Sequence, residues 1–383
     1  MRSYVVGGAV RDQLLGLPVQ DRDHVVVGAT PEQMLAAGFR PVGKDFPVFL
    51  HPETQEEYAL ARTERKTAKG YHGFAFYTAP DVTLEQDLVR RDLTINAMAL
   101  GEEGEIVDPY GGQADLGERV FRHVSEAFAE DPVRILRVAR FAARLPEFRV
   151  ADTTNALMRR MVDEGEVDAL VPERVWQELS RGLMEQRPSR MLAVLRDCGA
   201  LARILPELGV PQEPGEEGDA RIMEAIDGAA RRAHPLEVRF AVLMLGIGAG
   251  AAPDPKPVQD VCKRLKVPNE CRDLALMTAR ETGLAAQRSV ALDPEAIVSL
   301  FERCDAFRKP ERFAQMLLAA ASAPRVPNLL QQTAPQLTKA LAAARAVNAG
   351  EIAQRYVESK DRIPEAVHAG RVSAVEEALG PGH

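Results

Sequence analysis

Two kinds of hydrophobic spacing divide the chain. Over about the first 125 residues, short runs of apolar and β-branched residues alternate with segments whose apolar positions recur every three to four residues. This alternation predicts strands at 4–6, 23–27, 47–51, 57–61 and 120–123, with helices at 8–15 and 30–37. Beyond that point the strand signal disappears and the spacing becomes helical. The pattern predicts an α/β (α+β) head followed by an all-helical remainder.

The helical remainder is long enough for more than one unit. At 383 residues the chain exceeds one typical core, and we expect two to four units. We place the head at 1–125, a helical neck at 126–208 and a helical body and tail at 209–383, with a Pro- and Gly-rich linker at 211–220. In the body we predict helices at 222–232, 238–245, 257–265, 269–282, 294–303, 310–321, 334–348 and 352–359.

The overall charge argues against a protein that coats nucleic acid with bulk positive charge. The chain has 48 lysines and arginines against 56 acidic residues, a net charge of −8. A phosphate-rich partner therefore requires a localised arginine face. Four scattered cysteines without a C-x-x-C pair indicate reduced thiols, and no long apolar run is present in the sequence. We expect a cytoplasmic protein without a signal peptide or a membrane span.

A phosphate-binding turn is predicted near the N-terminus. Gly7 and Gly8 follow a predicted strand and open a predicted helix, so that unblocked backbone N–H groups face the turn. Arg11 lies in the first helical turn and can reach the same phosphates.

Two aspartates follow this turn closely. Asp21 and Asp23 lie at the start of a valine-rich strand, so both carboxylates are expected on one face. Paired oxygen ligands beside a phosphate-binding turn predict a Mg²⁺ site that handles a nucleoside triphosphate. Glu57, on a later strand, could supply a third carboxylate, and it could equally be a surface residue.

A row of arginines gives a second signal, in the helix predicted after Asp131. At about 100° per residue, one arc of roughly 120° holds Arg134, Arg137, Arg140 and Arg144. No acidic residue lies four positions before or after Arg137, Arg140 or Arg144. We predict that this arginine stripe binds an anion, either a triphosphate or an RNA backbone. Asp131 also has the place of an N-cap.

The segment between these signals carries two weaker ones. Residues 65–80 combine glycine, charge and aromatic residues without a clear period, and we predict a mobile loop beside the site, with a plain surface loop as the alternative. Arg90 and Arg91 are neighbours and cannot share one helix face, so one can contact a substrate while the other pairs elsewhere.

The motifs occur in a set order: Gly-Gly-x-Val-Arg-Asp, Asp-x-Asp, Arg-Arg-Asp-x-Thr-Ile-Asn-Ala and Glu-Asp-x-x-Arg. In this order and spacing the chain resembles the class II tRNA nucleotidyltransferases, the CCA-adding enzymes of bacterial type, whose head belongs to the superfamily of DNA polymerase beta. The resemblance is close over residues 1–205 and looser over the helical remainder. The same class contains bacterial poly(A) polymerases, but Asp21-Arg22-Asp23 and the strand near 56–62 look like the CCA-adding side.

The resemblance implies a role for each motif. Asp21 and Asp23 would hold two Mg²⁺ ions that activate the tRNA 3′-hydroxyl and stabilise the leaving pyrophosphate. The triphosphate would be bound by Gly8, Arg11, Arg91 and either Arg137 or Arg140. The ribose, with the 2′-hydroxyl that marks a ribonucleotide, would face Asp92 and Asn96.

Asp131 and Arg134 would read the base. Cytosine and adenine both present an amino donor beside a ring-nitrogen acceptor, whereas uracil and guanine present a carbonyl beside a ring N–H. One carboxylate acceptor and one guanidinium donor therefore match C and A without a nucleic-acid template.

The body departs from many bacterial relatives, which carry a metal-dependent phosphohydrolase with a His-Asp pair. Leu245 and Gly246 occupy the corresponding positions here, and neither can bind a metal. His234 is the only histidine between residues 200 and 360. We predict that phosphohydrolase activity is absent.

Three functions follow from these observations. The first is addition of C, C and A to tRNA 3′ ends from CTP and ATP. The second is a partial A- or C-adding enzyme or a poly(A) polymerase, and the third is a catalytically silent RNA-binding descendant. The tRNA would follow a positive track from the arginine stripe through Arg159, Arg160, Arg174 and Arg181. We predict no protein partner.

Overall fold

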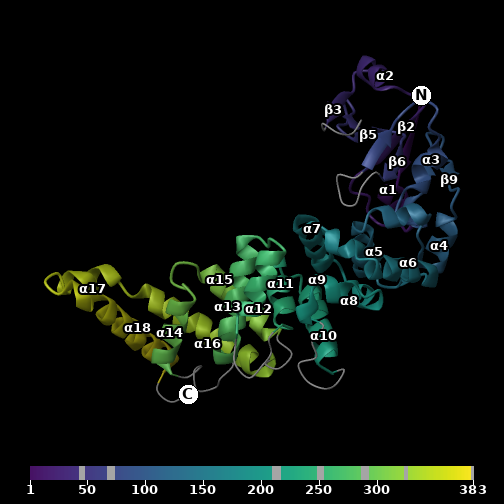
Figure 1. Ribbon diagram of the computed structural model, residues 1–383. Helices are drawn as coiled ribbons and strands as arrows, with labels where there is room; N and C mark the ends of the chain where they lie inside the picture. Colours follow the sequence, from purple (N-terminus) through teal and green to yellow (C-terminus); the bar gives the residue numbers. More distant parts are fainter. Residues whose placement is uncertain are drawn as a thin grey trace. The chain divides into compact units, whose positions relative to one another are not determined.

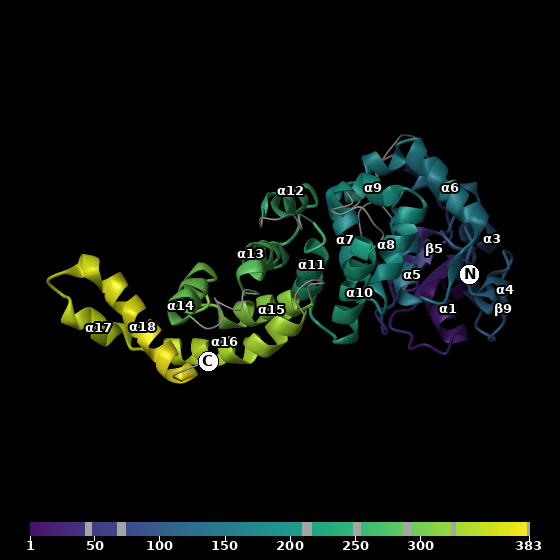
Figure 2. The same ribbon diagram turned by 90° about the horizontal axis from the view of Figure 1, so that it is seen from below.

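The computed structural model describes residues 1–42, 48–66, 74–208, 217–247, 254–285, 293–322 and 327–380. These residues form two compact units. The first contains Met1–Val175 with Arg190–Ile204, and the second contains Trp176–Ser189 with Leu205–His383. Figures 1 and 2 show strands among the helices of the first unit, and helices in the described part of the second unit. The head, neck and body boundaries predicted above stay predictions.

A seven-stranded mixed sheet organises the first unit, in the order β3-β4-β5-β2-β1-β8-β9. The strands are β1 (Arg2–Val6), β2 (Asp23–Val27), β3 (Arg40–Val42), β4 (Val48–Leu50), β5 (Glu57–Leu60), β8 (Ala99–Leu100) and β9 (Ile106–Val107). Strand β2 pairs antiparallel with β1 and parallel with β5, so it lies at the centre of the sheet. The predicted strands of the head are confirmed, whereas β3, β8 and β9 were not predicted.

Alternation along β2 separates two apolar clusters. Val25 belongs to a cluster with Val6 and Leu88, while Val26 belongs to another with Met34 and Phe49. The first cluster draws on α3 (Leu84–Val89) and the second on α2 (Pro31–Ala36). Each helix begins with a capping box, in which a threonine and the glutamine three residues later exchange hydrogen bonds with each other's backbone N–H.

A β-hairpin overlaps the segment predicted as a mobile loop. Strands β6 (Thr63–Lys66) and β7 (Phe74–Tyr77) pair antiparallel. The prediction of irregular structure is therefore wrong for residues 65–66 and 74–77. Residues 67–73, the middle of the predicted loop, lie outside the described residues.

Helices and short turns complete the first unit. They include α1 (Gly8–Leu14), α4 (Gly112–Glu118), α5 (Val133–Arg144), α6 (Asp152–Asp163), α9 (Ala200–Ile204) and the 3₁₀ turns η1 (Thr94–Asn96), η2 (Glu126–Glu130) and η3 (Glu166–Ala169). Strand β10 (Val120–Phe121) pairs in parallel with β11 (Arg149–Val150). The expectation that no strand follows residue 125 is wrong for β11, because a two-residue strand leaves no alternating pattern.

The described residues of the second unit are helical. Its elements are most of α7 (Pro172–Met184), the first residues of α8 (Pro188–Asp197), η4 (Pro206–Leu208), α10 (Glu217–Arg231), α11 (Leu236–Met244), α12 (Lys256–Arg264), α13 (Asn269–Ala285), α14 (Pro294–Arg303), α15 (Pro310–Ala321), α16 (Pro327–Ala346), α17 (Ala349–Arg355), η5 (Lys360–Arg362) and α18 (Ile363–Leu379). All eight predicted body helices have a counterpart. The predicted linker does not extend to residue 220, because α10 begins at Glu217, and residues 209–216 lie outside the described range. Among the described residues, no helix combines the length and apolar character of a membrane span.

Candidate active site

The bend between β1 and α1 requires glycine at its first position. Gly7 has φ of +72°, in the region that L side chains rarely adopt. A Cβ at Gly7 would also lie 3.1 Å from Nη1 of Arg91, so the Arg91 guanidinium packs directly against the bend. The predicted glycine turn is present, and it places Gly8 as the first residue of α1.

The strand register sets Asp23 beside this bend. Asp23 begins β2 and lies opposite Val6, the residue before Gly7, and opposite Glu57 on β5. The next residues on these two strands, His24 and Tyr58, stack with ring centroids 4.0 Å apart. Because neighbouring side chains alternate between faces, Asp23 and Glu57 share the face that His24 and Tyr58 do not occupy.

Asp21 has a different setting from the one predicted. It lies in an exposed, irregular segment before β2, since the strand begins at Asp23. Strand alternation therefore does not fix the direction of its carboxylate. Within the described ranges, no group of three or more His, Cys, Asp or Glu side chains is arranged to hold a metal ion.

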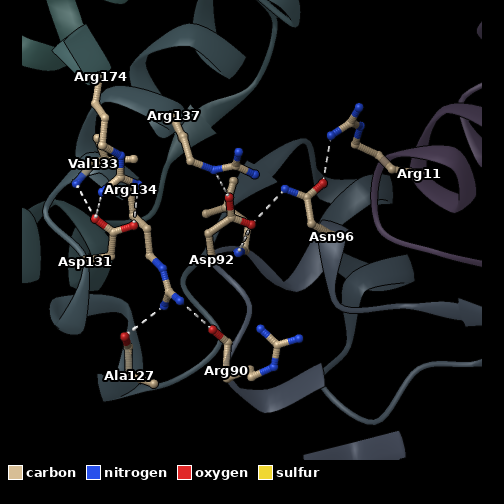
Figure 3. Close-up of polar contacts among 11 residues, drawn as sticks. Arg11, Arg90, Asp92, Asn96, Ala127, Asp131, Val133, Arg134, Arg137 and Arg174 are labelled. Carbon is tan, nitrogen blue, oxygen red and sulfur yellow. Dashed lines mark hydrogen bonds and ion pairs between the residues drawn. The ribbon is translucent and has the colours of Figure 1, made fainter. Parts of the chain in front are cut away.

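A chain of hydrogen bonds joins α1 to η1 and then to α5 (Figure 3). The buried Arg11 donates from Nη1 to Oδ1 of Asn96 at 2.7 Å and from Nη2 to Oδ1 of Asp12 at 2.7 Å. Asn96 donates in turn to Oδ1 of Asp92 at 2.9 Å, and Nε of Arg137 donates to Oδ2 of Asp92 at 2.7 Å. Predicted nucleotide-binding residues from three elements thus meet in one network.

Asp92 is ionised within this network. Burial alone would raise its pKa, but the charge of Arg137 and the hydrogen bonds from Asn96 and Arg137 outweigh burial and hold the pKa well below its usual range. For Arg11, burial lowers the pKa of the guanidinium, and the neighbouring Asp12 opposes this effect. The network therefore places ionised acceptors and donors side by side in a buried setting.

The arginine stripe on α5 has partners that the helix alone did not reveal. Arg137 pairs with Asp92, and Nη2 of Arg144 donates to Oδ2 of Asp12 at 2.8 Å. Arg140 lies over the ring of Phe141 at 4.6 Å. The helix supplies no acidic partner, as predicted, but other elements do. Arg137 and Arg144 are therefore paired within the protein, and the prediction that the stripe binds an anion stays a prediction.

The two residues predicted to read the base flank the start of α5. Oδ1 and Oδ2 of Asp131 accept from Nη1 and Nη2 of Arg174 at 3.1 and 2.8 Å, and Oδ1 also accepts from the N–H of Val133 at 3.1 Å. Arg134 is buried and donates to the carbonyl oxygens of Ala127 and Arg90 at 2.8 and 2.7 Å. Figure 3 shows the Asp131 carboxylate facing Arg174, and the Arg134 guanidinium between the carbonyl oxygens of Ala127 and Arg90.

Sequence reasoning missed several residues of this region. Asp12, Arg144 and Arg174 were not assigned to the site, although Arg144 belonged to the stripe and Arg174 to the predicted tRNA track. Asp87 was also missed. It lies three positions before Arg90 and four before Arg91, and this helical spacing could have predicted that Asp87 pairs with both arginines.

The chain matches known protein families over its first half. Residues 3–122 match the Poly A polymerase head domain, and residues 147–210 match the probable RNA and SrmB-binding site of polymerase A. A multifunctional CCA protein of Burkholderia cenocepacia is 60% identical over 413 residues, covering 100% of both chains. This chain belongs to the CCA-adding enzyme family. A second member, the multifunctional CCA protein of Ralstonia nicotianae, is 60% identical over 98% of this chain and 94% of its own.

Solved structures of CCA-adding enzymes share the fold. The Bacillus stearothermophilus CCA-adding enzyme in complex with CTP superposes with a TM-score of 0.66 at 25% identity, covering 97% of this chain and 88% of its own. The Thermotoga maritima CCA-adding enzyme complexed with tRNA gives a TM-score of 0.66 at 23% identity, over 99% and 90% of the two chains. The predicted polymerase-beta type head with a helical remainder is therefore confirmed.

Proposed function

We propose that this CCA-adding family member adds C, C and A to the 3′ end of tRNA from CTP and ATP, without a nucleic-acid template and with release of pyrophosphate. The observation that carries the proposal is the register that sets Asp23 beside the Gly7 bend and opposite Glu57. The full-length identity to multifunctional CCA proteins supports the choice of reaction.

Asp21 and Asp23 would hold Mg²⁺. When bound, this ion would activate the 3′-hydroxyl of the tRNA and stabilise the leaving pyrophosphate. Both aspartates are exposed and offer the oxygen ligands that this ion prefers. Glu57 lies opposite Asp23 on the same face of the sheet, and we propose that it serves as a third carboxylate.

The nucleotide would lie between the bend and α5. Gly8 and Arg91 would bind the triphosphate, with the buried Arg11 adding positive charge behind the bend while its donors hold Asn96. Arg137 and Arg140 would extend this positive surface. Asp92 and Asn96 would face the ribose.

Asp131 and Arg134 would select the base. The carbonyl bonds of Arg134 fix the plane of its guanidinium, and the paired bonds from Arg174 fix the Asp131 carboxylate. Preformed donor and acceptor groups discriminate well, because a mismatched base leaves a buried polar group unpaired.

We further propose that this chain lacks the phosphohydrolase activity. A Cβ at Gly246 would lie 3.0 Å from Cγ1 of Ile222 and 3.2 Å from Cδ2 of Leu208, so apolar side chains close around the position of the predicted missing metal ligand. A metal-dependent phosphatase activity lost on mutating this region would contradict the proposal. We also propose that the protein works in the cytoplasm, which agrees with four buried, unpaired cysteines.

An extension assay tests the main proposal. A tRNA that lacks its three terminal nucleotides is incubated with CTP alone, ATP alone and both. We expect two C residues with CTP and completion by one A with both nucleotides. A long A tract would instead indicate a poly(A) polymerase, and products that stop after C or need a preformed CC end would indicate a partial enzyme. Absence of incorporation by the wild-type protein, with tRNA binding retained, would support the silent RNA-binding alternative.

A further inference from the structure

A fully buried carboxylate lies next to the proposed triphosphate site. Asp87 on α3 has no exposed surface. Its Oδ1 accepts from Nη2 of Arg90 at 2.6 Å and from the backbone N–H of Arg62 at 3.3 Å. Its Oδ2 accepts from Nη2 of Arg91 at 3.2 Å. One side chain thus binds two arginines and the chain just before β6.

Asp87 is ionised in this setting. Burial alone would raise its pKa, but the charges of Arg90 and Arg91 and the hydrogen bonds it accepts outweigh burial and lower the pKa. A buried charge of this kind is strongly destabilising once its partners are removed. The carboxylate is therefore a fixed anchor for the two guanidinium groups.

The anchor determines where Arg91 points. Asp87 holds Nη2 of Arg91, while Nη1 lies against Gly7, where a Cβ would be 3.1 Å away. The Nε atom of Arg91 is buried and has no hydrogen-bond partner within the part of the chain that the structure describes. Nη2 is thus held by Asp87, while Nη1 lies at the bend, where it can donate to a bound phosphate.

We propose that Asp87 is a positioning residue that aims Arg91 at the triphosphate of the incoming nucleotide. The proposal deepens the proposed function and rests on it. Asp87 acts through Arg91 and not by touching the nucleotide. Its bond to the Arg62 N–H also fixes the chain that leads into β6, so the β6–β7 hairpin and the phosphate-binding arginine share one anchor.

The test compares binding of CTP with binding of CMP. Asp87→Asn keeps the size of the side chain and removes its charge. We expect CTP to bind about tenfold more weakly, the size of one hydrogen bond to a charged group, while CMP binding stays the same because CMP lacks the outer phosphates. In an Arg91→Gln background, Asp87→Asn should cause little further loss. Equal weakening of CTP and CMP, or unchanged CTP binding, would overturn the proposal.

Two further variants keep the test decisive. Asp227→Asn is a matched control, because Asp227 is also buried and binds Ser189 and Arg187 in the second unit, and we expect it to leave the CTP to CMP ratio unchanged. If Asp87→Asn does not fold, Asp87→Glu retains the charge but displaces the carboxylate, and the same selective loss of CTP binding is expected. A wild-type protein that binds CTP no better than CMP would count against the proposed function itself.

Discussion

The Arg144 guanidinium donates to the Asp12 carboxylate at 2.8 Å, although 132 positions of sequence separate the two residues. The bond ties the last turn of α5 to α1, and Asp12 also accepts from Arg11. The helix that carries the stripe is thereby fixed to the helix that opens at the glycine bend.

Replacing Arg144 should destabilise the first unit. Asp12 is buried, so Arg144→Gln weakens a hydrogen bond to a charged group, and we expect the free energy of unfolding to fall by about 2 kcal/mol in urea titrations. Arg160→Gln is the control. Its ion pair with Glu126 is exposed on both sides, and its loss should change stability by less than about 0.5 kcal/mol. Equal losses for the two variants would contradict the argument.

Asp23→Asn should abolish nucleotide incorporation while leaving the fold intact. Asp23 is exposed, so the fold does not depend on its carboxylate. Loss of a metal ligand costs several kcal/mol of transition-state stabilisation, and we expect single-turnover rates to fall by about a thousandfold or more. EDTA should have a comparable effect on the wild type, reversed by Mg²⁺. Glu57→Gln measures whether the opposite strand contributes, and an unchanged rate would remove Glu57 from the site.

Asp131→Asn should weaken discrimination against UTP. A carboxylate only accepts hydrogen bonds, whereas an amide also donates and can pair with the carbonyl of uracil. We expect the ratio of kcat/KM for CTP over UTP to fall by about tenfold or more, the loss of one good hydrogen bond. Glu126→Gln, which alters an exposed carboxylate on the neighbouring turn, should leave this ratio unchanged.

The contact between α14 and α18 should depend on pH. Nε2 of His368 lies 2.7 Å from Glu295, Nδ1 lies 3.0 Å from Glu302, and Arg371 lies 3.8 Å from Glu302. Burial would lower the pKa of His368, but the hydrogen bonds to Glu302 and Glu295 outweigh burial and raise it. The stabilisation is therefore complete below the unfolded pKa of about 6.5 and disappears as the pH rises through the higher folded value.

Thermal denaturation of wild type and His368→Gln measures this dependence. We expect the wild type to be more stable than His368→Gln at pH 6. This difference in melting temperature should shrink as the pH rises above the folded pKa of His368. Glu295→Gln removes one of the two carboxylates that raise the pKa of His368, and it should also reduce the pH dependence of the melting temperature. A difference between wild type and His368→Gln that stays constant from pH 6 to 9 would contradict the assignment.

Gly246→Asp should destabilise the second unit without restoring a metal site. The new carboxylate would press against Ile222 and Leu208, and burying it among apolar side chains is unfavourable. We expect a clearly lower melting temperature than for Gly246→Ala, which adds only the Cβ. The double variant Leu245→His with Gly246→Asp should show no metal-dependent phosphatase activity.

Local patterns predicted much of this molecule. The glycine bend, the valine-rich β2 and the body helices each have a signal within one segment, and all are present. Two-residue strands such as β8 and β9 are too short to show alternation. Helix α18 was missed because its apolar residues do not gather on one side of the helix, and only Val375 is buried.

Partners from distant segments could not be predicted. The acidic partners of Arg137 and Arg144 come from the segment before η1 and from α1, and helix spacing contains no information on either. The setting of Asp21 depends on where β2 begins, which propensity alone does not define to a single residue. The sequence thus predicted local elements better than the contacts between side chains from distant segments.

The network from Asp12 to Arg137 also has a consequence for the nascent chain. Asp12 and Asp92 emerge from the ribosome well before α5, which carries Arg137 and Arg144. Until α5 has been made, each carboxylate lacks the arginine of α5 that helps to compensate for its burial. The catalytic head is therefore expected to mature late in synthesis, after the stretch matched by the head-domain family has been completed.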